Sequence, residues 1–326
     1  MKSSITTAPP ILHLCGPTAS GKSSLAEKLA EQFDVELISV DSALVYRGMD
    51  IGSAKPNAET LARCRYHLID LIEPEASYSA AKFVADANAL IAQIQSRRRI
   101  PILVGGTMLY FRALTQGLSD LPTTDPALRA ALLQELETRG LSALHAELAQ
   151  VDPTAAARIH PNDAQRTLRA LEVFRQTGVP LSAQQLAWRS VAPVADNVLR
   201  FALYPDRAWL HERIALRFRQ MLDAGFLDEV RALMARPKLS IDHTSMRAVG
   251  YRQAWQHVFG DFDANELFLR GVAATRQLAK RQITWIRSDP GLLRLEGTAE
   301  QNYDSLCVKL QDQLTGKSAE SNTIRS

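Results

Sequence analysis

The chain has 326 residues, of which 46% are hydrophobic and 22% are charged, so it holds enough apolar material for a core with more than one layer of structure. Its longest apolar runs, such as residues 101–104 and 198–203, are far shorter than a bilayer requires, and we expect no contact with a membrane. A net charge of +3 and a pI near 8.8 are mild, so charge alone does not identify a nucleic-acid binder.

The three cysteines, Cys15, Cys64 and Cys307, are odd in number and widely separated along the chain. This spacing excludes a disulfide framework and a Cys-x-x-Cys metal site. Unpaired cysteines are typical of a reducing compartment, and we therefore expect the protein in the cytoplasm.

The first 115 residues alternate short apolar runs with helical patterns. Strands are predicted at residues 11–15, 36–40 and 100–104, and helices at residues 25–33 and 80–94. This order of βαβ units predicts an α/β fold, with a parallel sheet and helices on both of its faces.

The strand pattern disappears between residues 125 and 185. Leucines recur there at helical spacing in residues 128–136, and apolar residues do so again in residues 168–174 after Asn162 and Asp163, which suit a helix cap. We therefore expect an all-helical insertion.

The core pattern resumes after this insertion. A strand is predicted at residues 198–204, and long amphipathic helices follow at residues 209–222 and 266–286.

The segment 16–23 matches the pattern G-x-x-x-x-G-K-[ST], between a predicted strand and a helical pattern. In such a loop, backbone amides and the helix N-terminus surround phosphate oxygens, a lysine adds a point charge, and a Ser or Thr hydroxyl ligates magnesium. The loop comprises Gly16, Pro17, Thr18, Ala19, Ser20, Gly21, Lys22 and Ser23. It predicts a polyphosphate site that would take a nucleotide or a prenyl pyrophosphate alike, and a chance match in a tight turn is the weaker alternative.

The expected fold is therefore a P-loop NTPase-like parallel sheet with helices on both faces and a helical insertion domain. Its predicted parts are a P-loop core in residues 1–120, the insertion in residues 121–195, the core continuation with basic helices in residues 196–315, and a disordered tail in residues 316–326.

Two further side chains follow predicted strands. Asp41 comes directly after the strand 36–40, and Thr107 follows the strand 100–104 and Gly105-Gly106. Since the carboxyl ends of parallel strands face the ligand crevice, both are expected near the phosphate loop. Asp41 is a candidate base or metal ligand, or else an Asp that caps a helix or closes a turn. Thr107 binds a substrate or caps the next helix, and the pattern favours neither.

The segment 275–287 carries Arg276, Lys280, Arg281 and Arg287 without an acidic residue. Contact with nucleic-acid phosphates and a solvated helix face are equally consistent with this run.

Six ordered motifs resemble the bacterial tRNA dimethylallyltransferases. They are GPTASGKS, ELISVDSALVYRGMDIGSAKP, ILVGGTMLYFRAL, ARIHPNDAQRTLRALEV, RAVGYRQ and ATRQLAKRQITWIR. The resemblance extends from Ile11 to about Arg287. It implies transfer of a dimethylallyl group from dimethylallyl pyrophosphate to the exocyclic N6 amine of the adenosine 3′ of the anticodon in tRNA, with Mg²⁺ as cofactor. We further expect a monomer.

The resemblance also implies roles for single residues. Asp41 is the general base, Thr107 contacts the target base, and Lys22 and Arg217 join the phosphate loop at the pyrophosphate, with Ser23 as the magnesium ligand. Ser23 stands where Thr is common, and either residue offers a hydroxyl. The implied tRNA contacts are Asp41, Ser42, Ala43, Leu44, Thr107, Arg129, Gln165, Arg166, Thr167, Leu168, Arg169, Arg247, Ala248, Val249, Gly250, Tyr251, Arg252, Lys280, Arg281, Gln282, Ile283, Thr284, Trp285, Ile286 and Arg287.

Two other functions share the phosphate loop. A small-molecule kinase would need lid arginines for ATP and would have no use for the basic helix. An RNA-binding NTPase switch would carry a guanine-reading motif such as Asn-Lys-x-Asp, which the sequence lacks.

Overall fold

The computed structural model describes residues 8–117, 121–122, 125–188 and 197–315. The disordered tail predicted for residues 316–326 lies outside these residues. The chain forms two compact units, one built from residues 1–111 and 195–326 and the other from residues 112–194. Each unit is described by itself below.

The first unit is built on a parallel sheet, which among the described residues has six strands in the order β3-β2-β4-β1-β5-β6. The strands are β1 (Ile11–Cys15), β2 (Val35–Val40), β3 (Tyr66–His67), β4 (Ile100–Gly105), β5 (Val198–Leu203) and β6 (Leu293–Leu295). The predicted α/β fold class is confirmed. The pattern missed only the short outer strands β3 and β6.

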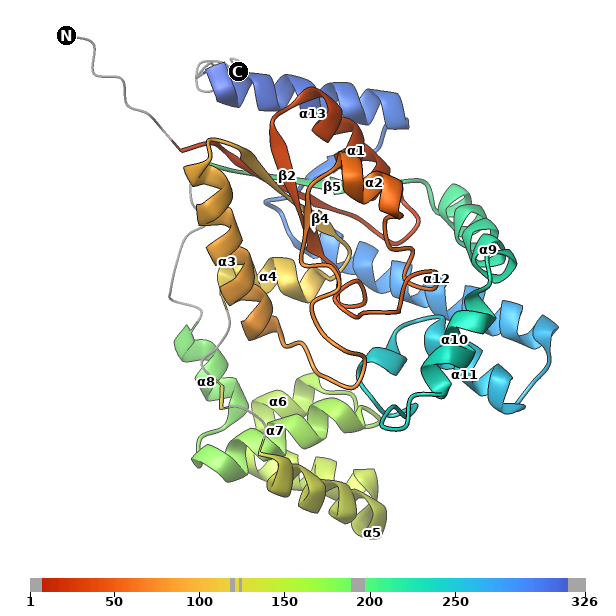
Figure 1. The fold of residues 1–326 in the computed structure, drawn as a ribbon. Helices are drawn as coiled ribbons and strands as arrows, with labels where there is room; N and C mark the ends of the chain where they lie inside the picture. Colours follow the sequence, from red (N-terminus) through yellow and green to blue (C-terminus); the bar gives the residue numbers. More distant parts are fainter. Residues whose placement is uncertain (1–7, 118–120, 123–124, 189–196, 316–326) are drawn as a thin grey trace. The chain divides into compact units, whose positions relative to one another are not determined.

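Helices cover both faces of this sheet (Figure 1). On one face, Leu12 and Leu14 of β1 pack in a buried cluster with residues of α1 (Lys22–Gln32) and α13 (Ala299–Thr315). The intervening His13 points to the other face, where its ring lies 5.5 Å from that of Phe111 in α4. The helices there are α3 (Ala80–Ser96) and α4 (Met108–Gln116). Side chains alternate along each strand because successive Cβ atoms point to opposite faces.

The remaining helices of this unit follow the strands. They are α2 (Ala58–Arg63), α9 (Arg207–Asp223), α10 (Phe226–Met234), the 3-10 helix η1 (Ser245–Arg247), α11 (Tyr251–Phe259) and α12 (Ala264–Ser288). Helix α9 packs against α12, where Gly271 leaves room for the ring of Phe218. In the part of the chain that the structure describes, no helix is both long and apolar enough to cross a membrane.

The second unit is helical. It contains α5 (Pro126–Val151, broken at Gly140), α6 (Pro153–Arg158), α7 (Ala164–Thr177) and α8 (Leu181–Trp188). Its core is rich in leucine, including Leu132, Leu144 and Leu171. The cap predicted for its third helix is confirmed, because the Asp163 side chain accepts a hydrogen bond from the backbone N–H of Arg166.

Gly105 allows β2 and β4 to approach closely at the end of the sheet that carries the functional residues. A Cβ at this position would lie 2.0 Å from the Val40 carbonyl oxygen. We expect Gly105→Ala to lower the free energy of unfolding by about 3 kcal/mol or more, because the obstacle is backbone that cannot rotate away. Denaturant titration measures this loss.

The matched control is Gly178→Ala, which has open space around it and bears only the cost of its left-handed backbone, about 1 to 2 kcal/mol. Equal losses in the two variants would contradict the close contact at Gly105.

Candidate functional site

The phosphate loop connects the end of β1 to the start of α1. Its backbone is left-handed at Ala19 and at Gly21, with φ values of 63° and 87°. Such a path is readily adopted by glycine and lets successive amides face one side of the loop. The helix that begins at Lys22 adds the positive end of its dipole. The local structure therefore has the features of an anion site.

Lys22 lies within this loop, where its Nζ donates a hydrogen bond to the Pro17 carbonyl oxygen at 3.2 Å. Burial lowers the pKa of its ammonium group to about 8. The carboxylate of Asp41 acts in the opposite direction, and the guanidinium of Arg217 lowers this pKa further. Lys22 is thus held as a weakly solvated cation that a bound anion would stabilise.

Arg217 of α9 reaches the same loop from another part of the sequence. Its Nη1 donates to the Thr18 hydroxyl oxygen at 3.4 Å. Burial lowers the pKa of this guanidinium, and the Asp41 carboxylate raises it. Two half-buried cations and one carboxylate therefore interact around the loop.

Asp41 and Thr107 lie together at the ends of β2 and β4. The Asp41 Oδ1 accepts a hydrogen bond from the Ala43 amide at 2.8 Å, so the turn role considered for this residue is real. Among the described residues, Oδ2 makes no hydrogen bond. The Thr107 hydroxyl oxygen accepts from the Ser42 amide at 3.0 Å, so Thr107 ties β4 to the segment after Asp41.

Gln282 of α12 joins the phosphate loop to the end of β4. Its Oε1 accepts a hydrogen bond from the Thr18 amide at 2.8 Å, and its Nε2 donates to the Gly106 carbonyl oxygen at 2.8 Å. The side chain is 6% exposed. A side-chain amide suits this place because it offers one acceptor and one donor at once. Gln282 is also one of the predicted tRNA contacts, and in this structure its side chain is buried in the bridge.

An apolar pocket of about 50 Å³ adjoins the loop. A cavity needs about 10–15 Å³ to hold one water molecule. The pocket is several times larger, and it therefore has room for a small branched group. Its apolar lining comes from Ile214, Phe218, Met221, Val249 and Leu278. Thr18 and Arg217 line it as well, so an apolar group in the pocket would lie beside an anion in the loop.

The basic helix predicted to bind RNA divides into two faces. Ile286 and Gln282 are buried, and Ile283 is half-buried. The exposed residues are Lys280, Arg281, Thr284, Trp285 and Arg287.

The segment predicted to contact RNA before α11 is divided in the same way. Arg247 and Arg252 are exposed, whereas Tyr251 and Gly250 are buried. Val249 lines the apolar pocket.

In the helical unit, Gln165 and Arg166 are exposed, while Thr167 and Leu168 are buried in the helix core and offer no side chain to a ligand. Arg129 and Arg169 converge on the buried carboxylate of Glu172, at 3.6 Å and 3.1 Å. Because one carboxylate meets two guanidinium groups, a net positive charge stays at this point.

The pocket lining was missed by sequence analysis. A signal was present, since Ile214, Phe218 and Met221 recur on the same face of α9 as Arg217, at helical spacing. Glu229, which contacts the segment that contains Gly52, had no comparable signal.

A parallel sheet with a phosphate loop at the carboxyl end of β1 and two half-buried cations beside it defines the class of P-loop proteins. A family model described as IPP transferase matches residues 44–289, which is most of the chain. The chain therefore belongs to the IPP transferase family, and the resemblance carried by its motifs is confirmed.

Individual relatives agree with this assignment. The chain is 57% identical to a tRNA dimethylallyltransferase of Thiobacillus denitrificans over 293 residues, which cover 90% of this chain and 93% of the relative. It is 33% identical to the crystal structure of a tRNA isopentenylpyrophosphate transferase from Bacillus halodurans, with a TM-score of 0.68 over 95% of this chain and 99% of that one.

A structure of a eukaryotic dimethylallyltransferase acting on tRNA shares the fold. Its TM-score is 0.78 at 23% identity, and the match covers 97% of this chain and 82% of that one.

Gln282→Leu tests the bridge between the loop and β4. It keeps the volume but leaves the Thr18 amide and the Gly106 carbonyl unpaired, at a cost of about 1–3 kcal/mol each. We expect a loss of stability in denaturant titration and weaker binding of inorganic pyrophosphate in calorimetry. Arg281→Ala, on the exposed face of the same helix, should change neither quantity. Normal stability together with weakened RNA binding would restore Gln282 as an RNA contact.

The lowered pKa of Lys22 predicts a pH dependence of anion binding. Because the free site loses the lysine charge as the pH rises through about 8, affinity for inorganic pyrophosphate should be steady below pH 8 and fall by up to about tenfold per unit above it. Calorimetry between pH 7 and 9.5 measures this slope.

Lys22→Arg is the control, since a guanidinium stays charged over this range. Its affinity should show no such decline, whatever its absolute value. A wild-type affinity that is the same at pH 7 and pH 9.5 would contradict the assignment.

Proposed function

We propose that the chain transfers the dimethylallyl group of dimethylallyl pyrophosphate to the N6 amine of the adenosine 3′ of the anticodon in tRNA, with release of pyrophosphate. Membership of the IPP transferase family supports the reaction class, and the named relatives carry the same activity in their names. The observation that carries the proposal is the apolar pocket beside the phosphate loop, whose lining includes Thr18 of the loop and Arg217, which donates a hydrogen bond to Thr18.

The charges of the site suit the leaving group. Cleavage of the allylic carbon–oxygen bond puts negative charge on pyrophosphate and positive charge on the prenyl carbon. Lys22, Arg217 and the loop amides stabilise an anion at that place, and they are preorganised because burial and hydrogen bonds hold them. The apolar pocket accommodates the dimethylallyl group and keeps water from the reacting carbon.

The adenine amine is a weak nucleophile because its lone pair is delocalised into the ring, and its nitrogen must lose a proton as it bonds to the prenyl carbon. We propose that Asp41 accepts that proton through Oδ2, since Oδ1 already accepts a hydrogen bond from the Ala43 amide. Thr107, tied to Ser42 beside it, is the proposed contact of the target base. The base has to leave its stack, at a cost of a few kcal/mol that a single-stranded loop reduces.

Mg²⁺ fits the oxygen donors of the loop. The hydroxyl of Ser23 stands exposed in the first turn of α1, and Mg²⁺ is usually held by one or two protein oxygens together with substrate phosphates and water. Within the described ranges there is no cluster of three or more His, Cys, Asp or Glu residues for a metal, which agrees with a site shared with the substrate. Bound there, Mg²⁺ would neutralise charge on the pyrophosphate.

The exposed cations suit a polyanionic partner. Lys280, Arg281 and Arg287 lie on one helix, and Arg247 and Arg252 precede or begin another. Contacts of this kind bind phosphates without reading sequence. We propose that they hold tRNA. The proposal includes action as a monomer in the cytoplasm, a reducing compartment that suits the buried free thiols of the chain.

Incubation of the purified protein with tRNA, Mg²⁺ and dimethylallyl pyrophosphate tests this function. We expect an adenosine that carries one added dimethylallyl group, detected by mass spectrometry of the digested RNA. Phosphorylation of a nucleoside monophosphate by ATP would favour a kinase. Hydrolysis of a nucleotide with no change in the RNA would favour a switch.

Asp41→Asn separates the roles of this residue. The amide keeps the acceptor for the Ala43 amide but cannot take a proton, so the melting temperature should hold while the single-turnover rate falls by about 10² to 10⁴-fold. If Asp41 were mainly a metal ligand, pyrophosphate affinity would fall as well and added Mg²⁺ would partly restore it. A near-normal rate would rule out the base.

A further inference from the structure

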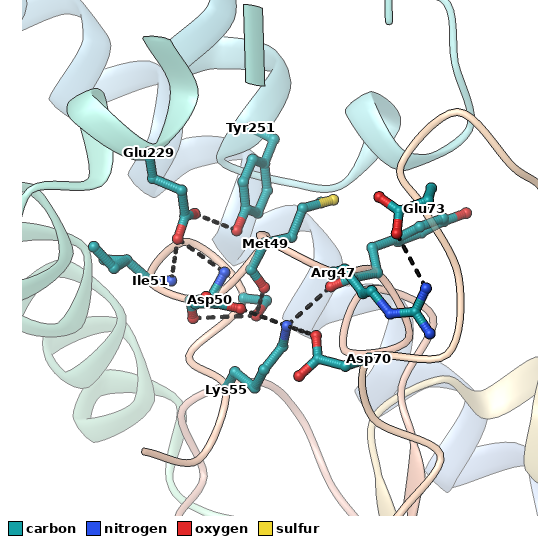
Figure 2. A network of polar contacts seen from close by, with 11 residues as sticks. Arg47, Met49, Asp50, Ile51, Lys55, Asp70, Glu73, Glu229 and Tyr251 are labelled. Atoms are coloured by element: carbon teal, nitrogen blue, oxygen red, sulfur yellow. Dashed lines mark hydrogen bonds and ion pairs between the residues drawn. The ribbon is translucent and has the colours of Figure 1, made fainter. Parts of the chain in front are cut away.

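Glu229 of α10 holds the turn at residues 50–52 by its carboxylate (Figure 2). Its Oε2 accepts hydrogen bonds from the amides of Asp50 and Ile51 at 2.8 and 2.6 Å. Its Oε1 accepts from the Gly52 amide at 3.2 Å and from the Tyr251 hydroxyl at 2.6 Å. One side chain therefore fixes three consecutive amides and the first residue of α11.

The turn forms part of the wall of the apolar pocket. Gly52 lines this pocket together with Gly250, which directly precedes Tyr251. Both glycines are backed by aromatic rings. A Cβ on Gly52 would lie 2.1 Å from Phe226, and one on Gly250 would lie 3.7 Å from the same ring. The space behind these two glycines is therefore filled by aromatic side chains.

The rings behind the wall are themselves tightly packed. Phe226 and Tyr251 are completely buried, and their rings meet edge to face with centroids 5.0 Å apart. Phe218, which also lines the pocket, lies edge-on to Phe226 at 6.4 Å. Because an interior packed in this way transmits displacement instead of absorbing it, the wall can move only if the turn moves.

A cation fixes the other side of the turn. The ammonium group of Lys55, which is 4% exposed, pairs with the carboxylates of Asp50 and Asp70 and donates to the Tyr46 carbonyl oxygen (Figure 2). The turn is therefore held at both ends. Glu229 is the member of this network that connects it to the pocket wall through Gly52 and Tyr251.

We propose that Glu229 is a positioning residue that fixes the depth of the apolar pocket and so restricts the donor to a short, five-carbon allylic chain. The inference rests on the proposed function, because it takes the pocket as the place of the prenyl group. With the turn held against the rings, a ten-carbon chain meets the backbone of Gly52 and Gly250. With the turn released, the same chain gains room.

The test compares dimethylallyl pyrophosphate with geranyl pyrophosphate, a ten-carbon allylic donor, on an anticodon stem-loop RNA. Glu229→Gln keeps the size of the side chain but replaces one acceptor oxygen with an amide donor, which cannot face the backbone N–H groups. One methylene in an apolar pocket is worth about 10- to 200-fold in specificity. We expect the ratio of kcat/KM for geranyl over dimethylallyl pyrophosphate to rise by about tenfold or more, with the affinity for inorganic pyrophosphate unchanged.

Asp228→Asn is the matched control, because it removes a carboxylate from the adjacent position of the same helix, where Asp228 forms a surface ion pair with Arg231. It should leave the donor ratio as in the wild type. Tyr251→Phe removes one of the four hydrogen bonds to Glu229 and should shift the ratio in the same direction by less. This variant carries the test if Glu229→Gln does not fold.

A purely structural role gives a different result. Loss of activity with both donors in equal proportion, in Glu229→Gln or in Tyr251→Phe, would overturn the proposal. Failure of the proposed function is distinct from this outcome, since the wild-type protein would then prenylate the RNA with neither donor.

Discussion

The candidate site depends on the two hydrogen bonds that the side-chain amide of Gln282 makes. This amide fixes the phosphate loop to the end of β4 by accepting from the Thr18 amide and donating to the Gly106 carbonyl. Without it, two buried backbone groups would lose their partners, and the loop would lose its position relative to Thr107. The two reacting sides of the proposed chemistry, pyrophosphate at the loop and adenine near Asp41, are therefore held in register by one neutral side chain.

The architecture of the central sheet could be predicted because the buried strands are short, apolar and separated by clear helical patterns. β1 and β4 are found within one residue of their predicted ends. The outer strands β3 and β6 could not be predicted, since they have two and three residues and no alternation that distinguishes them from loop. Their pairing depends on neighbours that lie far away in the sequence.

The parts of the candidate site that consist of residues close together in the sequence were predictable. The parts that depend on contacts between distant residues were not. The loop 16–23 and Asp41 follow directly from strand ends. By contrast, Gln282 sits in a basic helix whose charges suggest RNA, and only its burial identifies its role as a bridge. Glu229 looks like any exposed helix glutamate, because the amides that it accepts from are about 180 positions earlier in the chain.

The length of chain between Thr18 and Gln282 bears on how the protein is made. Their hydrogen bond joins residues 264 positions apart, so at about 5–20 residues per second the ribosome adds the second partner roughly 13 to 50 s after the first. When β1, β2 and β4 have all been synthesised, the loop still lacks its bridge, and it gains the guanidinium of Arg217 only 199 positions after Thr18. A chain that ends before α12 would carry the whole phosphate-loop motif and still lack a fixed phosphate site.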